Sequence, residues 1–177
     1  SIKDQGGKLT AFKSYTGGLV APESDDNPWH YKFTWNPRNV VVAGQTTAQY
    51  LENDVIKFMP YKRLFEEYRL TEVPELGTFE IYPNRDSLSY RKVYAMDNIP
   101  TIYRGTMRKR GFCDAWNAMV KIGLTDENIK IKHSNEMTYR DLLNGFARPG
   151  SGSLEERIAD LIGEKVDSVV MDKLKWT

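Results

Sequence analysis

The patterning of the chain changes near Leu124, and this change constrains the fold more than any other feature. Before it, short stretches rich in β-favouring residues alternate with segments of helical spacing, whereas after it only helix signals follow one another. Strands are predicted at residues 8–15, 55–59, 79–82 and 101–107, and helices at 61–68, 87–96 and 111–122. A further helix is expected to begin at Asn36-Pro37 and to bury Val40 to Ala43. The alternation predicts an α+β fold in which helices cover one face of a mixed β-sheet.

Two capping signals organise the C-terminal third. Thr138 precedes Asp141 by three residues and Ser153 precedes Glu156 by three, which is the spacing of a capping box. Helices are predicted to begin after both signals, the second around residues 154–162, and a last helix around 164–175. The sequence therefore predicts an α+β domain over residues 1–124 and a small all-α subdomain over residues 125–177.

Charge and cysteine content exclude several classes of protein. Lys and Arg number 25 against 24 Asp and Glu, so no global field favours nucleic acid or anionic lipid. The single cysteine, Cys113, cannot form an internal disulfide, which indicates a reducing compartment such as the cytoplasm. No apolar run approaches the ~20 residues of a membrane span, and no signal peptide pattern opens the chain. Because the chain starts at Ser1 and not at Met, we expect it to be processed or excised from something longer.

The motifs of the common enzyme sites are missing. The sequence has no G-x-G-x-x-G or P-loop for nucleotides, no H-E-x-x-H for zinc and no G-x-S-x-G for hydrolysis. His30 and His133 stand far apart with no cysteine nearby, which argues against a metal site. Cys113 falls on the predicted helix 111–122, where a buried inert thiol is favoured over a nucleophile.

Two loops that follow predicted strands and precede predicted helices are the candidate binding segments. In the first, residues 83–87, Asp86 or Ser87 could simply cap the next helix, whereas Arg85 has no such role. The second, residues 104–110, holds four cations in seven residues. Arginine captures carboxylate or phosphate through its planar fork, and the N–H groups at the start of the next helix add to the preference for an anion. A solvated basic turn and a nucleic-acid patch are the alternatives for this segment.

A longer series of motifs resembles one enzyme family. Residues 14–23 read S-Y-T-G-G-L-V-A-P-E, and residues 26–38 contain D-N-P, Y-K-F-T-W and P-R. Farther on, residues 84–87 read N-R-D-S and residues 104–113 read R-G-T-M-R-K-R-G-F-C. In this order and at these intervals the motifs are similar to the signature of saccharopine dehydrogenases of the glutamate-forming type. The resemblance spans nearly the whole chain and weakens in the helical third.

This resemblance implies an enzyme larger than the present chain. Family members carry an N-terminal Rossmann domain that binds NAD or NADP, and this sequence resembles only the parts inserted into that domain. Their α+β portion is similar to the C-terminal domain of glyceraldehyde-3-phosphate dehydrogenase-like proteins. The complete protein is therefore expected to be a homodimeric oxidoreductase that acts on the secondary amine of saccharopine in lysine metabolism. This chain alone is expected to be inactive and to need no metal.

Resemblance, chemistry and position together assign the binding residues. The residues expected to contact the carboxylates of saccharopine are Lys32, Asn84, Arg85, Arg104, Thr106, Met107 and Arg108. Arg85 and residues 106–108 match segments that contact substrate in the family, whereas the other three follow from charge and position. Trp35 matches a stretch near the cofactor. No catalytic residue is expected in this chain, because the family places its acid and base in the Rossmann half.

Three departures from the family pattern leave the substrate open. Thr16 stands where the family often has Cys, Trp29-His30 replaces a Leu-Gly pair, and Lys109-Arg110 adds charge. One alternative is a related dehydrogenase of the carboxynorspermidine type, because such relatives reduce similar imines. The other is a free-standing module that binds an anion or nucleic acid through residues 104–110.

Overall fold

The computed structural model describes residues 2, 4–34, 36–42, 45–163 and 168–177. Its strands are β1 (Phe12–Thr16), β2 (Ala48–Glu52), β3 (Val55–Met59), β4 (Arg69–Val73), β5 (Gly77–Pro83) and β6 (Ile102–Lys109). Its α-helices are α1 (Pro37–Val42), α2 (Tyr61–Leu64), α3 (Tyr90–Val93), α4 (Phe112–Ile122), α5 (Tyr139–Phe146), α6 (Leu154–Ile162) and α7 (Ser168–Trp176). Two short 3₁₀ turns, Pro22–Ser24 and Ser134–Glu136, complete the elements of these residues.

Strand β6 is the centre of a mixed sheet. β1 runs parallel to it, from Phe12 opposite Ile102 to Thr16 opposite Thr106. β5 runs antiparallel along its second half, and β2 touches its beginning through a single pair, Leu51 opposite Ile102. The order β3-β2-β6-β5-β4, with β1 added at β6, gives the α+β architecture that the sequence predicts.

The segment that follows β5 fills the gap between β2 and β6. The Asn84 N–H donates to the carbonyl of Arg104 on β6 over 2.8 Å. On the other side, the Gln49 N–H donates to the carbonyl of Arg85, and the Ser87 N–H donates to the carbonyl of Gln49, both over 3.0 Å. Residues 84–87 are therefore fixed by backbone bonds to two strands, although they form a loop.

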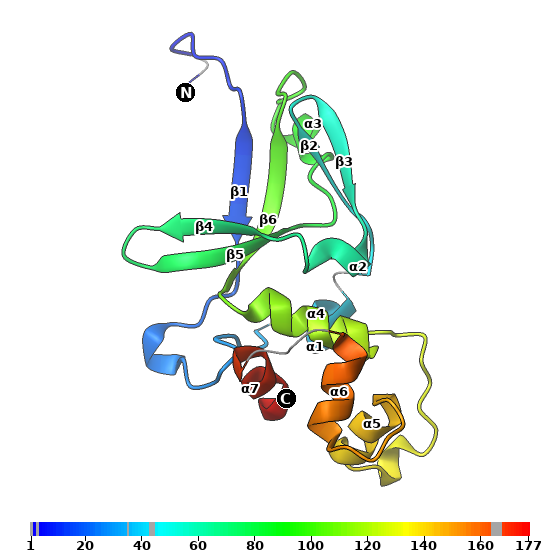
Figure 1. Cartoon of the computed structure of the whole chain (residues 1–177). Helices are drawn as coiled ribbons and strands as arrows, with labels where there is room; N and C mark the ends of the chain where they lie inside the picture. The colour runs from blue at the N-terminus through cyan, green and yellow to red at the C-terminus, as the bar shows by residue number, and fades with distance from the viewer. Residues whose placement is uncertain (1, 3, 35, 43–44, 164–167) are drawn as a thin grey trace.

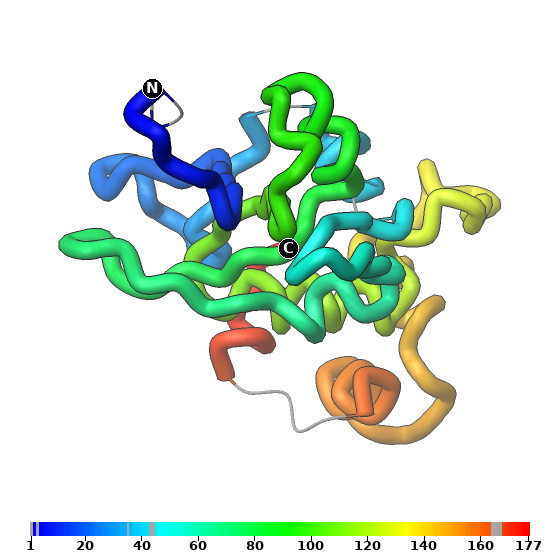
Figure 2. The backbone as a smooth tube through the Cα atoms, turned by 90° about the horizontal axis from the view of Figure 1, so that it is seen from above, coloured from blue at the N-terminus to red at the C-terminus, as the bar shows by residue number. Residues whose placement is uncertain are grey.

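The longer helices gather on one side of the strands, with α4 between the sheet and the C-terminal helices (Figure 1). Glycines in the left-handed conformation bound α4 at both ends, Gly111 at φ 79° and Gly123 at φ 100°, so this predicted helix ends where expected. Eight of its 11 residues are buried, and α6 and α7 pack on it within one hydrophobic cluster. Figure 2 shows α5 and α6, in orange, at the periphery, away from the N-terminal strand. The division into two domains at residue 125 stays a prediction.

Both predicted capping boxes are confirmed. The Asp141 N–H donates to Thr138 Oγ1 over 3.2 Å, and the Thr138 N–H donates back to Asp141 Oδ2 over 2.9 Å. The Glu156 N–H donates to Ser153 Oγ over 3.1 Å, and the Ser153 N–H donates to Glu156 Oε2 over 2.8 Å. Each pair satisfies two backbone donors that the start of a helix leaves without partners.

Several predicted elements differ from the structure. β2 and β4 were not predicted, and the predicted helices at 61–68 and 87–96 shrink to the four-residue α2 and α3. Both missing strands belong to hairpins whose turns hold non-glycine residues at positive φ, Asn53 and Asp54 in one and Glu75 in the other. Asn and Asp are among the residues that adopt this conformation at least cost, which is why Asn53-Asp54 was a usable turn signal. The helix that follows Asn36 is present, but its valines are half-buried, and Ala43 lies outside the described residues.

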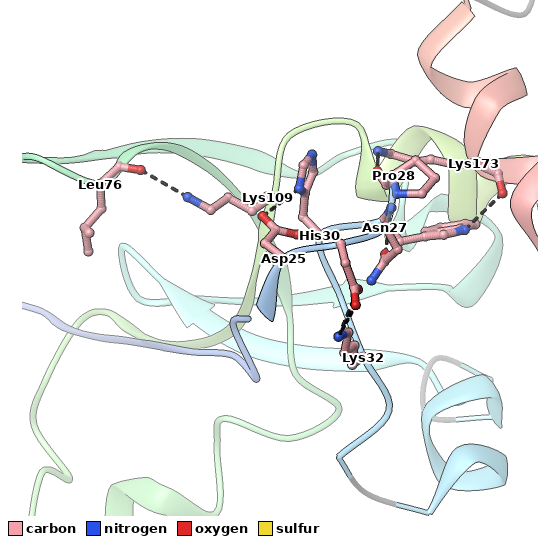
Figure 3. A network of polar contacts seen from close by, with 10 residues as sticks. Asp25, Asn27, Pro28, His30, Lys32, Leu76, Lys109 and Lys173 are labelled. Carbon is pink, nitrogen blue, oxygen red and sulfur yellow. Dashed lines mark hydrogen bonds and ion pairs between the residues drawn. The ribbon is translucent and has the colours of Figure 1, made fainter. Parts of the chain in front are cut away.

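A polar network joins the C-terminal helix to the loop before Tyr31 (Figure 3). The indole N–H of Trp29 donates to the carbonyl of Lys173 over 3.0 Å, and the Lys173 ammonium donates to the carbonyl of Pro28. Lys173 is buried and Trp29 packs edge-on against Phe112 of α4. The loop is therefore held by contacts with both α7 and α4, directly before the buried Tyr31.

Candidate functional site

A cavity of about 820 Å³ lies where β6, the 84–90 loop and the start of α4 meet. Its polar lining comes mainly from β6 and from the loop that follows β5: Asn84, Arg85, Asp86, Ser89, Arg104, Thr106 and Arg108. Its aromatic lining comprises Tyr31, Phe65, Tyr82, Tyr90, Phe112 and Trp116. Five of the seven residues predicted to bind substrate, Asn84, Arg85, Arg104, Thr106 and Arg108, are thus brought together.

Strand alternation explains which β6 residues line the cavity. Successive side chains of a strand point to opposite faces, so Arg104, Thr106 and Arg108 share one face. Met107 has the other parity, is absent from the lining and packs partly buried against the hydrophobic core. Lys109 has the parity of Met107; its ammonium lies 4.5 Å from the centroid of Phe79 and donates to the carbonyl of Leu76 (Figure 3). The expected loop at residues 104–110 is therefore wrong as far as Lys109, because these residues lie on β6, and the strand divides their cations between its two faces.

Arg108 is the most buried cation of the cavity, with a relative exposure of 7%. Its guanidinium carbon lies 4.5 Å from the centroid of Tyr31 and 5.2 Å from that of Phe112. One terminal nitrogen donates to the carbonyl of Met107 over 3.0 Å, and the buried Nε has no hydrogen-bond partner among the described residues. A buried donor without a partner is costly, and this nitrogen is closed off from solvent and from the cavity.

Arg104 is held by the loop that follows β5. Its backbone N–H donates to Ser87 Oγ over 2.9 Å, and its guanidinium carbon lies 3.7 Å from the centroid of Tyr90. Asp86 caps the turn before α3, because its Oδ1 accepts from the N–H groups of Leu88 and Ser89. The N-cap of α3 itself is Ser89, which makes no side-chain cap bond, so the expected helix N-cap at Asp86 or Ser87 is wrong. The pKa of the Asp86 carboxyl is lowered, first of all by the hydrogen bond from the Ser89 side chain.

Arg85 and Asn84 form the outer part of the cavity. Arg85 is exposed, and no side-chain partner of its guanidinium occurs among the described residues. The Asn84 amide oxygen accepts from Thr106 Oγ1 over 2.7 Å, which fixes the amide against β6. Tyr82 lines the cavity beside them, and burial raises the pKa of its phenol to about 12, so it remains a neutral donor.

Lys32 does not join this group, and for Trp35 the expected place is not tested. Lys32 pairs with Asp26 over 2.8 Å at the surface and is absent from the cavity lining (Figure 3). That ion pair also lowers the pKa of Asp26, chiefly through the hydrogen bond from Lys32. Trp35 lies outside the described residues, so its expected place near a cofactor stays a prediction.

The start of α4, expected to attract an external anion, already holds one. Glu80 of β5 is 1% exposed, and its two carboxylate oxygens accept from the N–H groups of Gly111 and Cys113 over 2.6 and 2.8 Å. A carboxylate at this position satisfies the free donors and the positive end of the helix dipole. The expectation that these N–H groups bind a ligand is therefore wrong, because the chain supplies the anion itself.

The cysteine and the two histidines, which are the remaining candidates for reactive chemistry, lie away from the cavity lining. Cys113 is fully buried, and burial raises the pKa of its thiol, so the predicted inert thiol fits. His30 contacts Asp25 over 2.8 Å, and His133 lies 4.0 Å from Glu136. Within the described ranges, no group of three or more His, Cys, Asp or Glu side chains could hold a metal ion.

Gly17 allows the chain to pass close to β6 before it enters the cavity wall. A Cβ at this position would lie 2.1 Å from the carbonyl oxygen of Met107 and 3.1 Å from a terminal nitrogen of Arg108. Any side chain there would displace the strand or the guanidinium. Gly18, the next residue, lines the cavity itself.

The aromatic residues of the cavity were not predicted from the sequence. Tyr31 was part of a quoted motif, and the place of Tyr82 at the end of a predicted strand could have marked it as a neighbour of Asn84. Tyr90 carried no signal, because its role depends on the turn that Asp86 caps. The sequence indicated the charges of the site but not the surfaces that hold them.

The three arginines of the cavity make no ion pair with any described residue, whereas Arg38, Arg63 and Arg69 each pair with a glutamate. Unpaired guanidinium groups at the wall of a cavity give it a strong preference for anions, and their geometry suits carboxylates. The arrangement can bind and orient a molecule that carries several carboxylates. It offers no activated nucleophile.

Comparison with known proteins gives one consistent result. The family model of the saccharopine dehydrogenase C-terminal domain matches residues 1–175. The chain is 39% identical to the NADP(+), L-glutamate-forming saccharopine dehydrogenase of Schizosaccharomyces pombe over 189 residues, covering 99% of this chain and 41% of that protein. It is 35% identical to the alpha-aminoadipic semialdehyde synthase of Arabidopsis thaliana, covering 86% of this chain and 15% of that protein.

The fold agrees with a solved structure from the same group. The apo saccharopine dehydrogenase (L-Glu forming) of Saccharomyces cerevisiae matches with a TM-score of 0.81 at 29% identity, covering 99% of this chain and 41% of that chain. The present chain thus spans 15% to 41% of the length of these relatives. Separately, none of the helices that the structure describes has the length and hydropathy needed to cross a bilayer.

Proposed function

Because this chain belongs to the saccharopine dehydrogenase C-terminal domain family, we propose that it is the substrate-binding portion of an NAD(P)-dependent saccharopine dehydrogenase. Relatives named as L-glutamate-forming saccharopine dehydrogenases align with 88% and 99% of the chain, which supports this assignment. The substrate, the pyridine nucleotide and the activity of the complete enzyme are parts of the proposal, as is the cytoplasmic location expected from the single cysteine.

One observation carries the proposal: a cavity with three arginines and no acid paired to them. Saccharopine is an adduct of lysine and glutamate with three carboxylates around a secondary amine. Arg104 and Arg108 share a face of β6, and Arg85 reaches the same cavity from the adjoining loop. Charge-assisted hydrogen bonds from such groups are the strong polar contacts available to a carboxylate. The number and kind of cations therefore match the substrate class.

In this mechanism the chain binds and orients, while hydride chemistry belongs to the nicotinamide of the complete enzyme. Arginine contacts to the carboxylates would fix the carbon–nitrogen bond of saccharopine in one orientation, which favours transfer in a single geometry. Asn84 and Thr106 would add neutral hydrogen bonds beside the arginines. No acid–base step is assigned to this chain.

The described residues do not fit a dinucleotide. Pyrophosphate binding uses free N–H groups at a helix start behind a glycine-rich turn. At α4, the long helix that follows β6, those groups donate to the buried Glu80 carboxylate. We therefore place the cofactor mainly on another part of the complete enzyme and derive no step through it.

A homodimer is the expected assembly, and the edge strand β3 supports it. Ile56 and Phe58 on this strand are 48% and 62% exposed, and Val55 beside them is 52% exposed. β3 is at the end of the strand order, so its outer backbone groups are available for pairing. An exposed apolar edge of this kind is typical of a protein interface.

The test has two arms. The coding frame that contains this chain should also encode a Rossmann fingerprint upstream, and the complete protein should couple saccharopine oxidation to reduction of NAD or NADP. Calorimetry of this chain alone with either nucleotide should show no tight binding. A complete gene that encodes only these residues, or micromolar nucleotide binding by the chain alone, would contradict the proposal.

A further inference from the structure

Two of the cavity arginines, Arg104 and Arg108, are held by aromatic faces and not by acids. The Arg104 guanidinium carbon lies 3.7 Å from the centroid of Tyr90, and that of Arg108 lies 4.5 Å from the centroid of Tyr31. Arg69, on the opposite side of the sheet, also lies 4.5 Å from the centroid of Tyr103, but in addition it pairs with Glu52 over 2.8 Å. The two kinds of contact have different consequences for the N–H groups.

A stack on an aromatic ring uses the face of the guanidinium, whereas a carboxylate uses its edge. Tyr90 can therefore restrict the orientation of Arg104 without neutralising its charge or occupying its donors. The polar contact of the Arg104 guanidinium with the described chain is a long one, 3.4 Å from a terminal nitrogen to the carbonyl oxygen of Asp86. This contact alone would leave the plane of the group poorly fixed.

The loop before α3 is built so that Tyr90 reaches this position. Asp86 Oδ1 accepts from the N–H groups of Leu88 and Ser89 over 2.8 and 3.2 Å, which begins the turn that leads into α3. Ser87 Oγ accepts from the Arg104 N–H over 2.9 Å and ties the same turn to β6. Tyr90, the first residue of α3, is thereby placed over the side chain of the strand residue that the turn also binds.

We propose that Tyr90 is a positioning residue: it fixes the plane of the Arg104 guanidinium so that the N–H edge points into the cavity to receive a substrate carboxylate. The inference rests on the proposed function and adds the residue that prepares one of its anion sites. Binding is favoured because the arginine loses less conformational freedom when the ligand arrives. The effect falls on substrate affinity and not on the chemical step.

The experiment compares three variants in the complete enzyme: Tyr90→Leu, Tyr90→Phe and Tyr94→Leu. Tyr94 is the matched control, because it is a tyrosine one helical turn away whose ring lies tilted against those of Tyr90 and Phe12, with no arginine contact among the described residues. Tyr90→Leu should raise KM for saccharopine about three- to tenfold with kcat unchanged, which corresponds to the loss of one cation–π contact. Tyr90→Phe should retain wild-type KM, because it keeps the aromatic face, and Tyr94→Leu should also match wild type.

A double-mutant cycle and a readout independent of activity complete the test. In an Arg104→Ala background, Tyr90→Leu should have no further effect on KM. NMR of the arginine Nε–H should show faster rotation of the Arg104 guanidinium in Tyr90→Leu and unchanged rotation in Tyr94→Leu. The inference is overturned if Tyr90→Leu leaves KM and rotation unchanged, or if both leucine variants act alike. If the wild-type enzyme does not act on saccharopine, the proposed function fails, and the rotation measurement alone then decides the role of Tyr90.

Discussion

Two clusters of arginine and tyrosine lie on opposite faces of strand β6 and use their positive charge differently. On one face, Arg69 stacks 4.5 Å from the centroid of Tyr103 and pairs with Glu52, so its donors are satisfied within the chain. On the cavity face, Arg104 and Arg108 also lie against tyrosines, but no described carboxylate pairs with them. The first arrangement joins two strands within the fold, whereas the second leaves cations without a described acid beside them, as the proposed binding of an anion requires.

Glu80 shows the same distinction at a helix end. The start of α4 attracts anions through its free N–H groups and the helix dipole, yet the carboxylate of Glu80 already occupies it. Positive character alone therefore does not identify a binding site in this molecule. What matters is whether an acid of the chain already pairs with the positive group.

The largest effect should follow Glu80→Ala. The substitution removes a buried acceptor of two charged hydrogen bonds, so the free energy of unfolding should fall by roughly 3 kcal/mol or more in urea denaturation. Glu80→Gln should lose less, because an amide oxygen can still accept one bond. Equal stability of the alanine variant and the wild type would show that Glu80 is not the internal anion of α4.

Arg85→Lys tests the cavity arginines, which have no acid paired with them. Lysine keeps the charge but lacks the planar fork, so KM for saccharopine in the complete enzyme should rise roughly ten- to hundredfold, equivalent to about 1.5–3 kcal/mol. Stability should stay unchanged, because the Arg85 side chain is exposed. A variant with wild-type KM would remove Arg85 from the binding site.

Asp86→Ala asks whether the acid in the cavity lining serves the arginines there or the backbone of its own turn. Loss of the cap should lower the free energy of unfolding by about 1 kcal/mol at neutral pH. The pKa of this carboxyl is lowered from 3.8 in the folded state, so its contribution is present above that pH and is lost as the pH falls below it. The stability difference between variant and wild type should therefore shrink in acid. A pH-independent difference would contradict the capping role.

Arg69→Ala should give the smallest effect. The pair with Glu52 is partly exposed, so thermal or urea unfolding should show a loss of about 1 kcal/mol or less. KM for saccharopine should equal that of the wild type, because Arg69 is absent from the cavity lining. A rise in KM without a loss of stability would reverse the roles assigned to the two faces.

The sequence predicted the long, well-marked elements and missed those that depend on pairing. α4 has glycines at both ends, and α5 and α6 have complete capping boxes, so local signals were sufficient. β2 and β4 are short segments that become strands through their hairpin partners. Sequence spacing does not report a partner in space, and the short turns at α2 and α3 therefore read as longer helices.

The candidate site could be predicted in its charges more than in its geometry. Arg85 and Arg108 came from loop position and family resemblance, and the cavity contains both. Met107 could have been separated from Arg108 by strand parity alone, since neighbours on a strand face apart. The role of Tyr90 could not be predicted, because its cation–π contact with Arg104 depends on the folded turn, which the spacing of residues in the sequence does not specify.

Arg108 and Lys109 test the central claim most directly, because they are adjacent cations on opposite faces of β6. The measurement is the dissociation constant of saccharopine from the complete enzyme, by calorimetry at fixed salt, for Arg108→Lys and Lys109→Ala. Arg108→Lys should weaken binding roughly ten- to hundredfold, and Lys109→Ala should leave it unchanged. Wild-type affinity in Arg108→Lys together with weakened binding in Lys109→Ala would show that the substrate lies on the other face of the sheet.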